Sequence, residues 1–217
     1  MKKKCIIIGI LISIGIVIIL TGGCLNISEW PTQINHRINL TSTIDPWHPK
    51  IIELNVELNE RLTINDQQSE ENRLSSELYH LKSLIEEKIK PIPDIKNPYH
   101  PALEHYPTIS QALQGYDDCD GRAIIACSLL IHRGYNSYMI INNNHAWVII
   151  YFQSGESKEI LRETSTPSPG EWILQWNHKY IKINLNNPIL SAPLLLITLG
   201  LLILPLKHIL SNRTRTS

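Results

Sequence analysis

The sequence predicts an α+β domain whose two ends carry long apolar segments. Helical spacing of apolar residues dominates residues 69–90 and 119–133. Two β-rich runs follow at 136–142 and 145–152, joined by a pair of asparagines that is typical of a turn. Helices that precede consecutive antiparallel strands indicate the α+β class, with the helices packed on one sheet.

The first clear helix covers residues 69–90. Its apolar positions recur every three or four residues among Glu and Lys, at Leu74, Leu78, Leu81 and Ile85. Ser69 is a suitable N-cap, and Pro91 ends the helix. A short helix is expected near 107–113, with Thr108 close to its start.

The second clear helix begins at Cys119 and ends at Arg133, because Gly134 can adopt the left-handed conformation of a helix C-terminus. Further short strands are expected at 159–164 and within 171–183. Residues 51–62 fit a strand or a short helix equally well. Residues 25–50 are polar, contain proline and lack a sustained period, so they suggest a linker or an irregular approach to the domain.

Both ends of the chain carry uncharged apolar runs with positive flanks. Lys2–Lys4 precede the first run, and Lys207 and Arg213 follow the second. About 20 apolar residues in a helix span a bilayer, and positive flanks stay in the cytoplasm. The sequence therefore predicts two transmembrane helices, a cell-membrane location and an extracytoplasmic domain between them.

These assignments divide the chain into five parts. They are an N-terminal transmembrane segment or signal anchor at 1–24, a linker and helical region at 25–98, the α+β domain at 99–187, a transmembrane helix at 188–207 and a cytoplasmic tail at 208–217. The first run also fits a cleaved signal peptide, or a segment that ends in a lipid-modified Cys24. The second also fits a buried helix.

Charge excludes one class of partner. The chain has 20 basic and 20 acidic residues. Nucleic-acid binding depends on a basic surface that displaces phosphate counterions, so no nucleic-acid partner is expected.

Cys119 is the candidate nucleophile. It lies at the start of a predicted helix, where free N–H groups and the helix dipole stabilise a thiolate. Gly121 and Ala123 are small enough to let a substrate approach. Asp117, Asp118 and Asp120 oppose activation, because negative charge raises the pKa of a thiol. Cys127 on the same helix would lie about 12 Å away, too far for a disulfide.

His145 is the candidate base, because it opens a strand directly after a loop and can reach a helix N-terminus. Glu163, near the end of the next β-like run, is the candidate that orients the imidazole. Gln114 and the backbone N–H of Cys119 are candidates for an oxyanion hole. Asp120 and Trp147 are the other supporting residues of the predicted site.

A zinc site is the rival interpretation of the same region. Its ligands would be drawn from Cys119, Cys127, His132 and His145, but zinc ligands usually include a pair two to four residues apart. Cys127 is better explained as a small buried hydrophobe and His132 as a favourable charge at a helix C-terminus. The sequence predicts no metal and no cofactor.

The motifs together resemble the transglutaminase-like superfamily of archaea and bacteria. The resemblance rests on Asp118-Cys119-Asp120-Gly121-Arg122-Ala123, which opens a helix that ends at Gly134-Tyr135, and on His145-Ala146-Trp147-Val148. Glu163-Thr164-Ser165 is similar to the third motif, where Asp is more frequent than Glu. Gly121 stands where archaeal relatives often have an acidic residue. The resemblance covers residues 99 to about 176.

This resemblance implies a papain-like core with a Cys–His–Glu triad. The thiolate would attack an amide carbonyl to form a thioester, which water or an amine would resolve. The substrate would be a protein or a cell-wall peptide, and the enzyme a peptidase, an amidase or an acyltransferase. The alternative is an inactive binding or scaffold module at the membrane surface.

Overall fold

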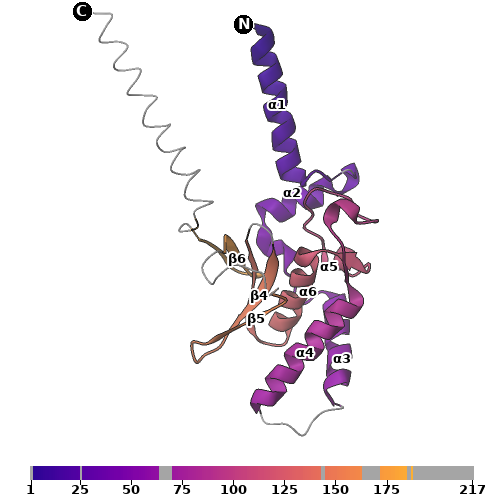
Figure 1. Cartoon of the computed structure of the whole chain (residues 1–217), viewed down its shortest axis with the longest axis vertical. Helices are drawn as coiled ribbons and strands as arrows, with labels where there is room; N and C mark the ends of the chain where they lie inside the picture. Colours follow the sequence, from indigo (N-terminus) through magenta and orange to yellow (C-terminus); the bar gives the residue numbers. More distant parts are fainter. Residues whose placement is uncertain are drawn as a thin grey trace, which may run out of the picture.

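The computed structural model describes residues 2–24, 26–63, 70–142, 145–162, 172–184 and 187. The order of elements is helical first and β-rich afterwards, which confirms the α+β class. Helices α3, α4 and α6 pack together, and the sheet lies against α6 (Figure 1).

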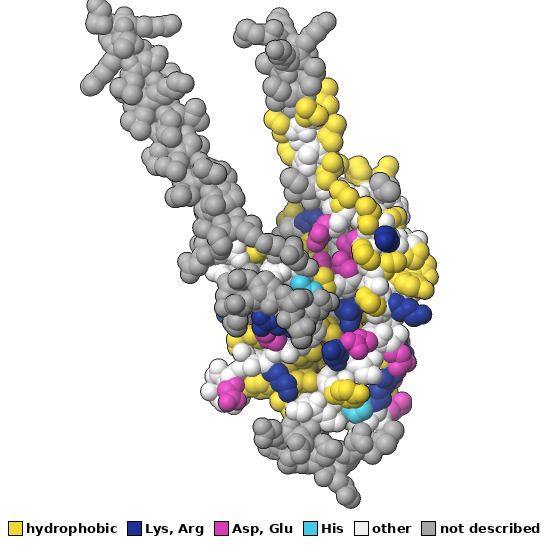
Figure 2. Space-filling model, in the orientation of Figure 1, with side chains coloured by type: hydrophobic (Ala, Val, Ile, Leu, Met, Phe, Trp, Pro, Cys, Tyr) yellow, Lys and Arg dark blue, Asp and Glu magenta, His cyan; other side chains and the backbone are white. Residues whose placement is uncertain are grey.

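Helix α1 (Lys2–Thr21) projects away from the domain (Figure 1). The side chains described along it are mostly exposed and apolar, among them Ile10, Leu11 and Ile14 (Figure 2). Within the described ranges, no helix combines the length and the apolar character that a membrane crossing needs.

The prediction of two flanking transmembrane helices, and of a two-span membrane location, is therefore wrong. In α1 the three lysines form the first turn of the helix instead of preceding it. The uncharged part is thus confined to 5–21, which is shorter than the roughly 20 residues of a typical span. The second predicted span, 188–207, lies outside the described residues.

The segment after α1 is helical where an irregular linker was expected. It contains η1 (Ile27–Glu29), α2 (Trp30–Ile38) and η2 (Leu40–Thr43). Asn26 caps η1, and Pro31 lies in the first turn of α2, where its missing N–H costs nothing. Gln33 and His36 are buried because both bind the backbone carbonyl of Tyr106, 70 or more residues away.

A helical hairpin forms one end of the domain. Its members are α3 (Pro49–Thr63) and α4 (Glu70–Lys88), which lie side by side (Figure 1). The undecided stretch 51–62 is thus a helix, and the helix predicted at 69–90 is confirmed to within two residues. Leu58 and Leu81 are among the fully buried side chains of this hairpin.

The chain then crosses to the central helix through short elements. These are β1 (Lys90–Pro91), η3 (Asp94–Lys96), α5 (Ile109–Ala112) and β2 (Tyr116–Asp117), with β1 and β2 paired in parallel. Thr108 and Gln111 form a capping box at the start of α5.

Helix α6 (Cys119–His132) is the centre of the core. Its apolar side chains are fully buried on several sides, because the hairpin covers one side and the sheet another. It ends as predicted: Gly134 has φ +88°, and the N–H of Tyr135 donates to the carbonyl of Leu130.

Among the described residues, the sheet has five antiparallel strands in the order β5-β4-β3-β6-β7. The strands are β3 (Asn136–Ile141), β4 (Ala146–Tyr151), β5 (Ser157–Ile160), β6 (Leu174–Trp176) and β7 (Ile181–Ile183). Met139 pairs with Val148, and both face the α6 core. Ile140, Trp147 and Ile149 point to the opposite face, as the two-residue period of a strand requires.

Candidate active site

Helix α6 is held at its start by two successive aspartates. The N–H of Asp120 donates to Oδ1 of Asp118 at 2.9 Å, so Asp118 is the N-cap of α6 and Cys119 is its first residue. The N–H of Asp118 in turn donates to Oδ1 of Asp117 at 2.9 Å. This arrangement explains locally why Cys119 stands at a helix N-terminus.

Gly121 makes room for one of these carboxylates. A Cβ atom at this position would lie 2.3 Å from Oδ2 of Asp117, closer than any real contact. The structure thus gives Gly121 a packing role against Asp117, where the sequence suggested room for substrate.

Cys119 and His145 line one cavity of about 130 Å³. The cavity lies between the start of α6, the β3–β4 turn and the loop before α5. Its other described lining residues are Glu104, Tyr106, Asp118, Asp120, Ile141 and Asn142. The structure therefore brings the predicted nucleophile, base and Asp120 to the same place.

The thiol of Cys119 lies against the first residue of β4. The backbone N–H groups of Ala146 and of Cys119 itself are directed at Sγ and lower the pKa of the thiol. Burial acts in the opposite direction and more strongly, followed by the charges of Asp120 and Asp118, so the pKa of Cys119 is raised overall. Sγ also lies 3.8 Å from Oδ1 of Asp120.

The ring of His145 is fixed by backbone contacts. Its Nε2–H donates to the carbonyl of Leu161 at 2.9 Å, so Nδ1 is the ring nitrogen that is left to accept a proton. The N–H of His145 donates to Oδ1 of Asn142 at 2.9 Å and closes the turn.

Leu161 adopts a conformation that is unusual for a bulky residue. Its φ is +61°, and it is the one non-glycine residue with positive φ in the described part of the chain. Backbone strain of this kind concentrates at functional sites. The Leu161 carbonyl makes the contact with His145 that the sequence predicts for Glu163. Glu163 itself lies outside the described residues.

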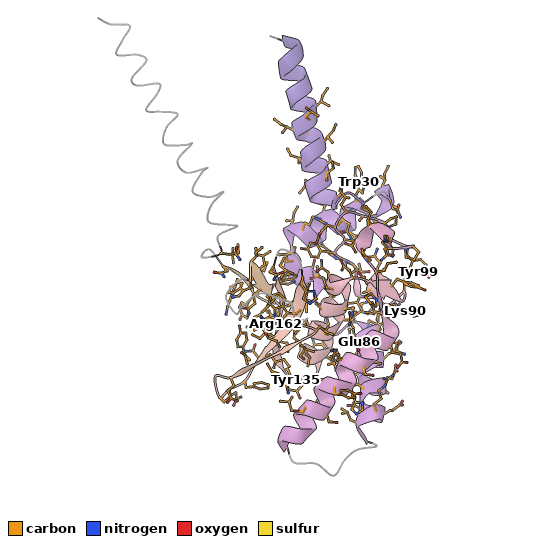
Figure 3. All side chains as sticks on the ribbon, viewed as in Figure 1. Trp30, Glu86, Lys90, Tyr99, Tyr135 and Arg162 are labelled. Carbon is orange, nitrogen blue, oxygen red and sulfur yellow. The ribbon has the colours of Figure 1, made fainter. Side chains whose placement is uncertain are left out.

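Trp147 packs on the base from the side of the sheet. Its ring is nearly parallel to that of His145, with an interplanar angle of 10° and centroids 6.2 Å apart. The guanidinium of Arg162, labelled in Figure 3, lies 5.8 Å from the Trp147 ring. Nε1–H of Trp147 donates to Glu159 at 3.2 Å, so the indole is anchored at both ends.

Gln114 is the predicted site residue that the structure places elsewhere. Among the described residues that line the cavity, Gln114 does not occur. Its amide oxygen lies 3.0 Å from Nε2 of His100, which is in the loop before α5. The assignment of Gln114 to an oxyanion hole therefore has no support in the geometry.

The cavity is strongly acidic, and burial suppresses part of its charge. It raises the pKa of Asp118 to about 6 and that of Asp117, just behind the cavity, to about 7. The pKa of the buried Asp120 is also raised well above its usual range, first by burial and then by Asp118. Neutral carboxyls can donate hydrogen bonds, so Asp120 could donate to an oxygen held in the cavity.

The sequence did not single out Glu104 or Tyr106, although both line the cavity. They belong to a loop that contributes to the site only through tertiary contacts. The phenol of Tyr106 is buried, and the pKa of Tyr106 is raised as a result.

The rival zinc interpretation is not supported by the arrangement of its residues. Cys127 is buried on the sheet side of α6, and Nδ1 of His132 lies 2.8 Å from the carbonyl of Pro46. Neither of them lines the cavity that holds Cys119 and His145. Cys119 and Cys127 are free thiols.

Comparison with known proteins adds no assignment. No family model, no curated protein and no solved structure matches this chain.

Proposed function

We propose that the chain is a transglutaminase-like cysteine enzyme that acts on amide bonds through a thioester on Cys119. The observation that carries the proposal is that Cys119 and His145 line one cavity, with the imidazole oriented so that Nε2 is occupied and Nδ1 is free to act as base.

The proposed reaction has two steps. In the first, Nδ1 of His145 takes the thiol proton, Sγ attacks the amide carbonyl carbon, and the amine leaves with the proton from the imidazolium. In the second, water or another amine attacks the thioester and releases the thiol. The Leu161 carbonyl serves as the group that orients His145 in both steps.

The lining also favours one class of substrate. Glu104 and Asp118 give the cavity an acidic wall. A cationic group near the scissile amide would be attracted to this wall and would offset the negative charge that raises the pKa of Cys119. We therefore propose protein or peptide substrates, including cell-wall peptides, that carry a free amine beside the reacting amide.

A second candidate follows from the pKa of the thiol. Because burial, Asp120 and Asp118 raise the pKa of Cys119, the resting thiol is protonated at neutral pH. A module that binds cationic peptides in the acidic cavity without chemistry would have the same features.

Peptide mass spectrometry separates the two candidates. The full chain is incubated with glutamine-containing peptides, with and without flanking lysines, and a tagged primary amine. We expect loss of ammonia or incorporation of the amine, abolished in Cys119→Ala and reduced about 100- to 10,000-fold in His145→Gln, as for loss of a general base. Cys127→Ser, which changes a thiol outside the cavity, is the matched control.

Two outcomes would contradict catalysis. One is product formation that is equal in Cys119→Ala and the unmodified sequence. The other is lysine-dependent peptide binding with no mass change in any peptide, which is the result expected of the binding module.

A further inference from the structure

A second cluster of polar side chains lies near the base of α1, away from the thiol of Cys119. It consists of Glu29, the last residue of η1, and of His100 and His105 in the loop before α5. Trp30 and Tyr99, the chain neighbours of Glu29 and His100, are labelled in Figure 3 at this end of the domain. The three side chains come from segments about 70 residues apart.

The three residues converge on one point. Nδ1 of His100 lies 2.7 Å from Oε1 of Glu29, and Nε2 of His105 lies 3.4 Å from Oε2 of the same carboxylate. One ligand atom from each residue lies within 4.8 Å of the others. The two imidazole rings are parallel, with an interplanar angle of 2° and centroids 5.1 Å apart.

His105 carries the strongest indication of a missing ligand. Its side chain is fully buried, and among the described atoms neither ring nitrogen has a hydrogen-bond partner. The 3.4 Å approach to Glu29 does not form a hydrogen bond. Burying a polar group without a hydrogen-bond partner costs free energy. The buried His105 imidazole therefore destabilises the fold unless something else binds it. A cation bound between Nε2 and Glu29 would give one of the two ring nitrogens a partner.

The spacing suits a small tetrahedral ion. Bonds of 2.0–2.1 Å from zinc to nitrogen or oxygen put neighbouring ligand atoms about 3.3 Å apart. The separation between His105 and Glu29 is 3.4 Å, close to this spacing. The 2.7 Å between His100 and Glu29 is a hydrogen bond, which lengthens when both residues bind the ion. Two imidazoles and one carboxylate suit zinc and its first-row neighbours, whereas magnesium and calcium prefer sets of oxygen ligands.

Outer contacts hold the ligands in place. Nε2 of His100 lies 3.0 Å from Oε1 of Gln114, the kind of second contact that orients a ligating histidine. The N–H groups of Tyr99 and His100 donate to Oδ1 of Asn97, and the N–H of His105 donates to Asp94. The loop is therefore shaped before any ion binds.

Cys24 lies beside this cluster without belonging to it. Its buried Sγ lies 3.7 Å from Oε2 of Glu29, but it does not lie within 4.8 Å of the ligand atoms of all three residues. Nε1–H of Trp30 donates to the Cys24 carbonyl at 3.0 Å and fixes this turn beside Glu29.

We propose that Glu29, His100 and His105 bind a divalent transition-metal ion of the zinc type. The proton that His100 shares with Glu29 passes to solvent on binding. With three protein ligands, the fourth position of the ion is open to water. It ties the segment after α1 to the loop that carries Glu104 and Tyr106 into the Cys119 cavity.

Titration of the full chain with zinc and cobalt tests the proposal. The protein is stripped with a chelator and titrated with zinc in competition with a chromogenic chelator. We expect one zinc per chain and a higher melting temperature when zinc is saturating, because an ion that binds only the folded state stabilises it. Cobalt should give the visible ligand-field bands of a tetrahedral site.

Variants identify the ligands. Glu29→Gln and His105→Gln should weaken zinc affinity by at least about 100-fold, the upper end of what loss of an outer contact costs. Glu29→Gln keeps the size of the side chain, and circular dichroism shows whether each variant is folded. His178→Gln, a histidine near the edge of the sheet, should bind as the unmodified chain does.

The cobalt spectrum tests whether the neighbouring Cys24 thiol binds the ion. A thiolate ligand gives a charge-transfer band in the near ultraviolet, and we expect no such band in the unmodified chain. A band that Cys24→Ser removes and Cys127→Ser keeps overturns the ligand set of Glu29, His100 and His105 with water. Absence of saturable zinc and cobalt binding, or affinity unchanged by both Glu29→Gln and His105→Gln, overturns the site.

Discussion

At the scale of single residues, Cys119 is subject to two opposing influences. The start of α6 and two backbone N–H groups favour a thiolate, while burial and the neighbouring carboxylates disfavour it. The net result is a raised pKa. The reactivity of this thiol should therefore depend on the protonation of its neighbours as well as its own.

Asp118→Asn should speed alkylation of Cys119 by iodoacetamide several-fold at pH 8. The pKa of Asp118 is raised to about 6, so at pH 8 its carboxylate is charged and raises the pKa of the thiol. One unit of thiol pKa changes the thiolate fraction about tenfold. Asparagine also caps a helix well, so α6 should remain intact. Alkylation is followed by peptide mass spectrometry.

The same variant supplies its own control at low pH. At pH 5, where Asp118 is mostly protonated, the two proteins should react at similar rates. Cys127 is buried, and its alkylation rate serves as the internal reference for that of Cys119. Equal rates at both pH values would show that the Asp118 carboxylate does not act on Cys119.

Residues whose positions depend on short-range signals can be predicted from the sequence. Cys119 lies at the start of α6 because Asp118 caps that helix, and His145 lies directly before β4 because a turn precedes it. These signals lie within three residues of their targets. Gln114 contacts His100 instead of lining the cavity, because this contact is made by residues that lie 14 apart in the chain and leave no local signal.

The histidine cluster could not be found in the same way. His100 and His105 are close in sequence, but Glu29 is about 70 residues away and lay in a stretch expected to be irregular. That stretch is helical at α2 because Gln33 and His36 bind the Tyr106 carbonyl. The structure of this stretch depends on tertiary contacts, which local sequence patterns do not indicate.

At the scale of elements, a buried ion pair joins α4 to the end of α6. Nε–H of Arg133 donates to Glu77, and its Nη1 donates to Asn55 and Asn59 of α3 at 2.6 and 2.7 Å. The hydroxyl of Tyr135, labelled in Figure 3, donates to the other oxygen of Glu77 at 2.9 Å. One guanidinium thus connects three helices.

Arg133→Met should lower the free energy of unfolding by about 3–5 kcal/mol, because it leaves the buried Glu77 carboxylate without its cation. The side chains of Arg133 and Glu77 are 15% and 8% exposed. Arg61→Met is the matched control: it breaks pairs with Glu57 and Glu87, and Arg61 is 25% exposed. Solvent-exposed ion pairs contribute about 1 kcal/mol or less to the free energy of unfolding. Urea denaturation measures the free energy of unfolding of both variants. Equal losses in Arg133→Met and Arg61→Met would show that the burial of the pair does not determine the cost of breaking it.

At the scale of the whole molecule, the buried acidic groups make stability depend on pH. Asp117 is almost fully buried, and burial followed by the charge of Asp118 raises its pKa from 3.8 to about 7. The folded state therefore binds the proton more tightly than the unfolded state does. Stability from this group is complete below about pH 4 and is lost as pH rises toward 7.

Asp117→Asn should remove this pH dependence, because asparagine resembles the neutral carboxyl and its oxygen can still accept from the N–H of Asp118. The two proteins should have similar stability near pH 4. At pH 8 the variant should be the more stable, by at most about 4 kcal/mol, which corresponds to the pKa difference. Thermal melts at several pH values measure the difference between the two proteins.

Histidines with lowered pKa, such as His36, affect the stability of both proteins equally, so their contribution cancels in the difference. Asp45→Asn changes an exposed aspartate and should leave the pH profile unchanged. Profiles of Asp117→Asn and the unmodified chain that run parallel from pH 4 to pH 8 would show that the Asp117 carboxyl is ionised at the same pH in the folded and unfolded states.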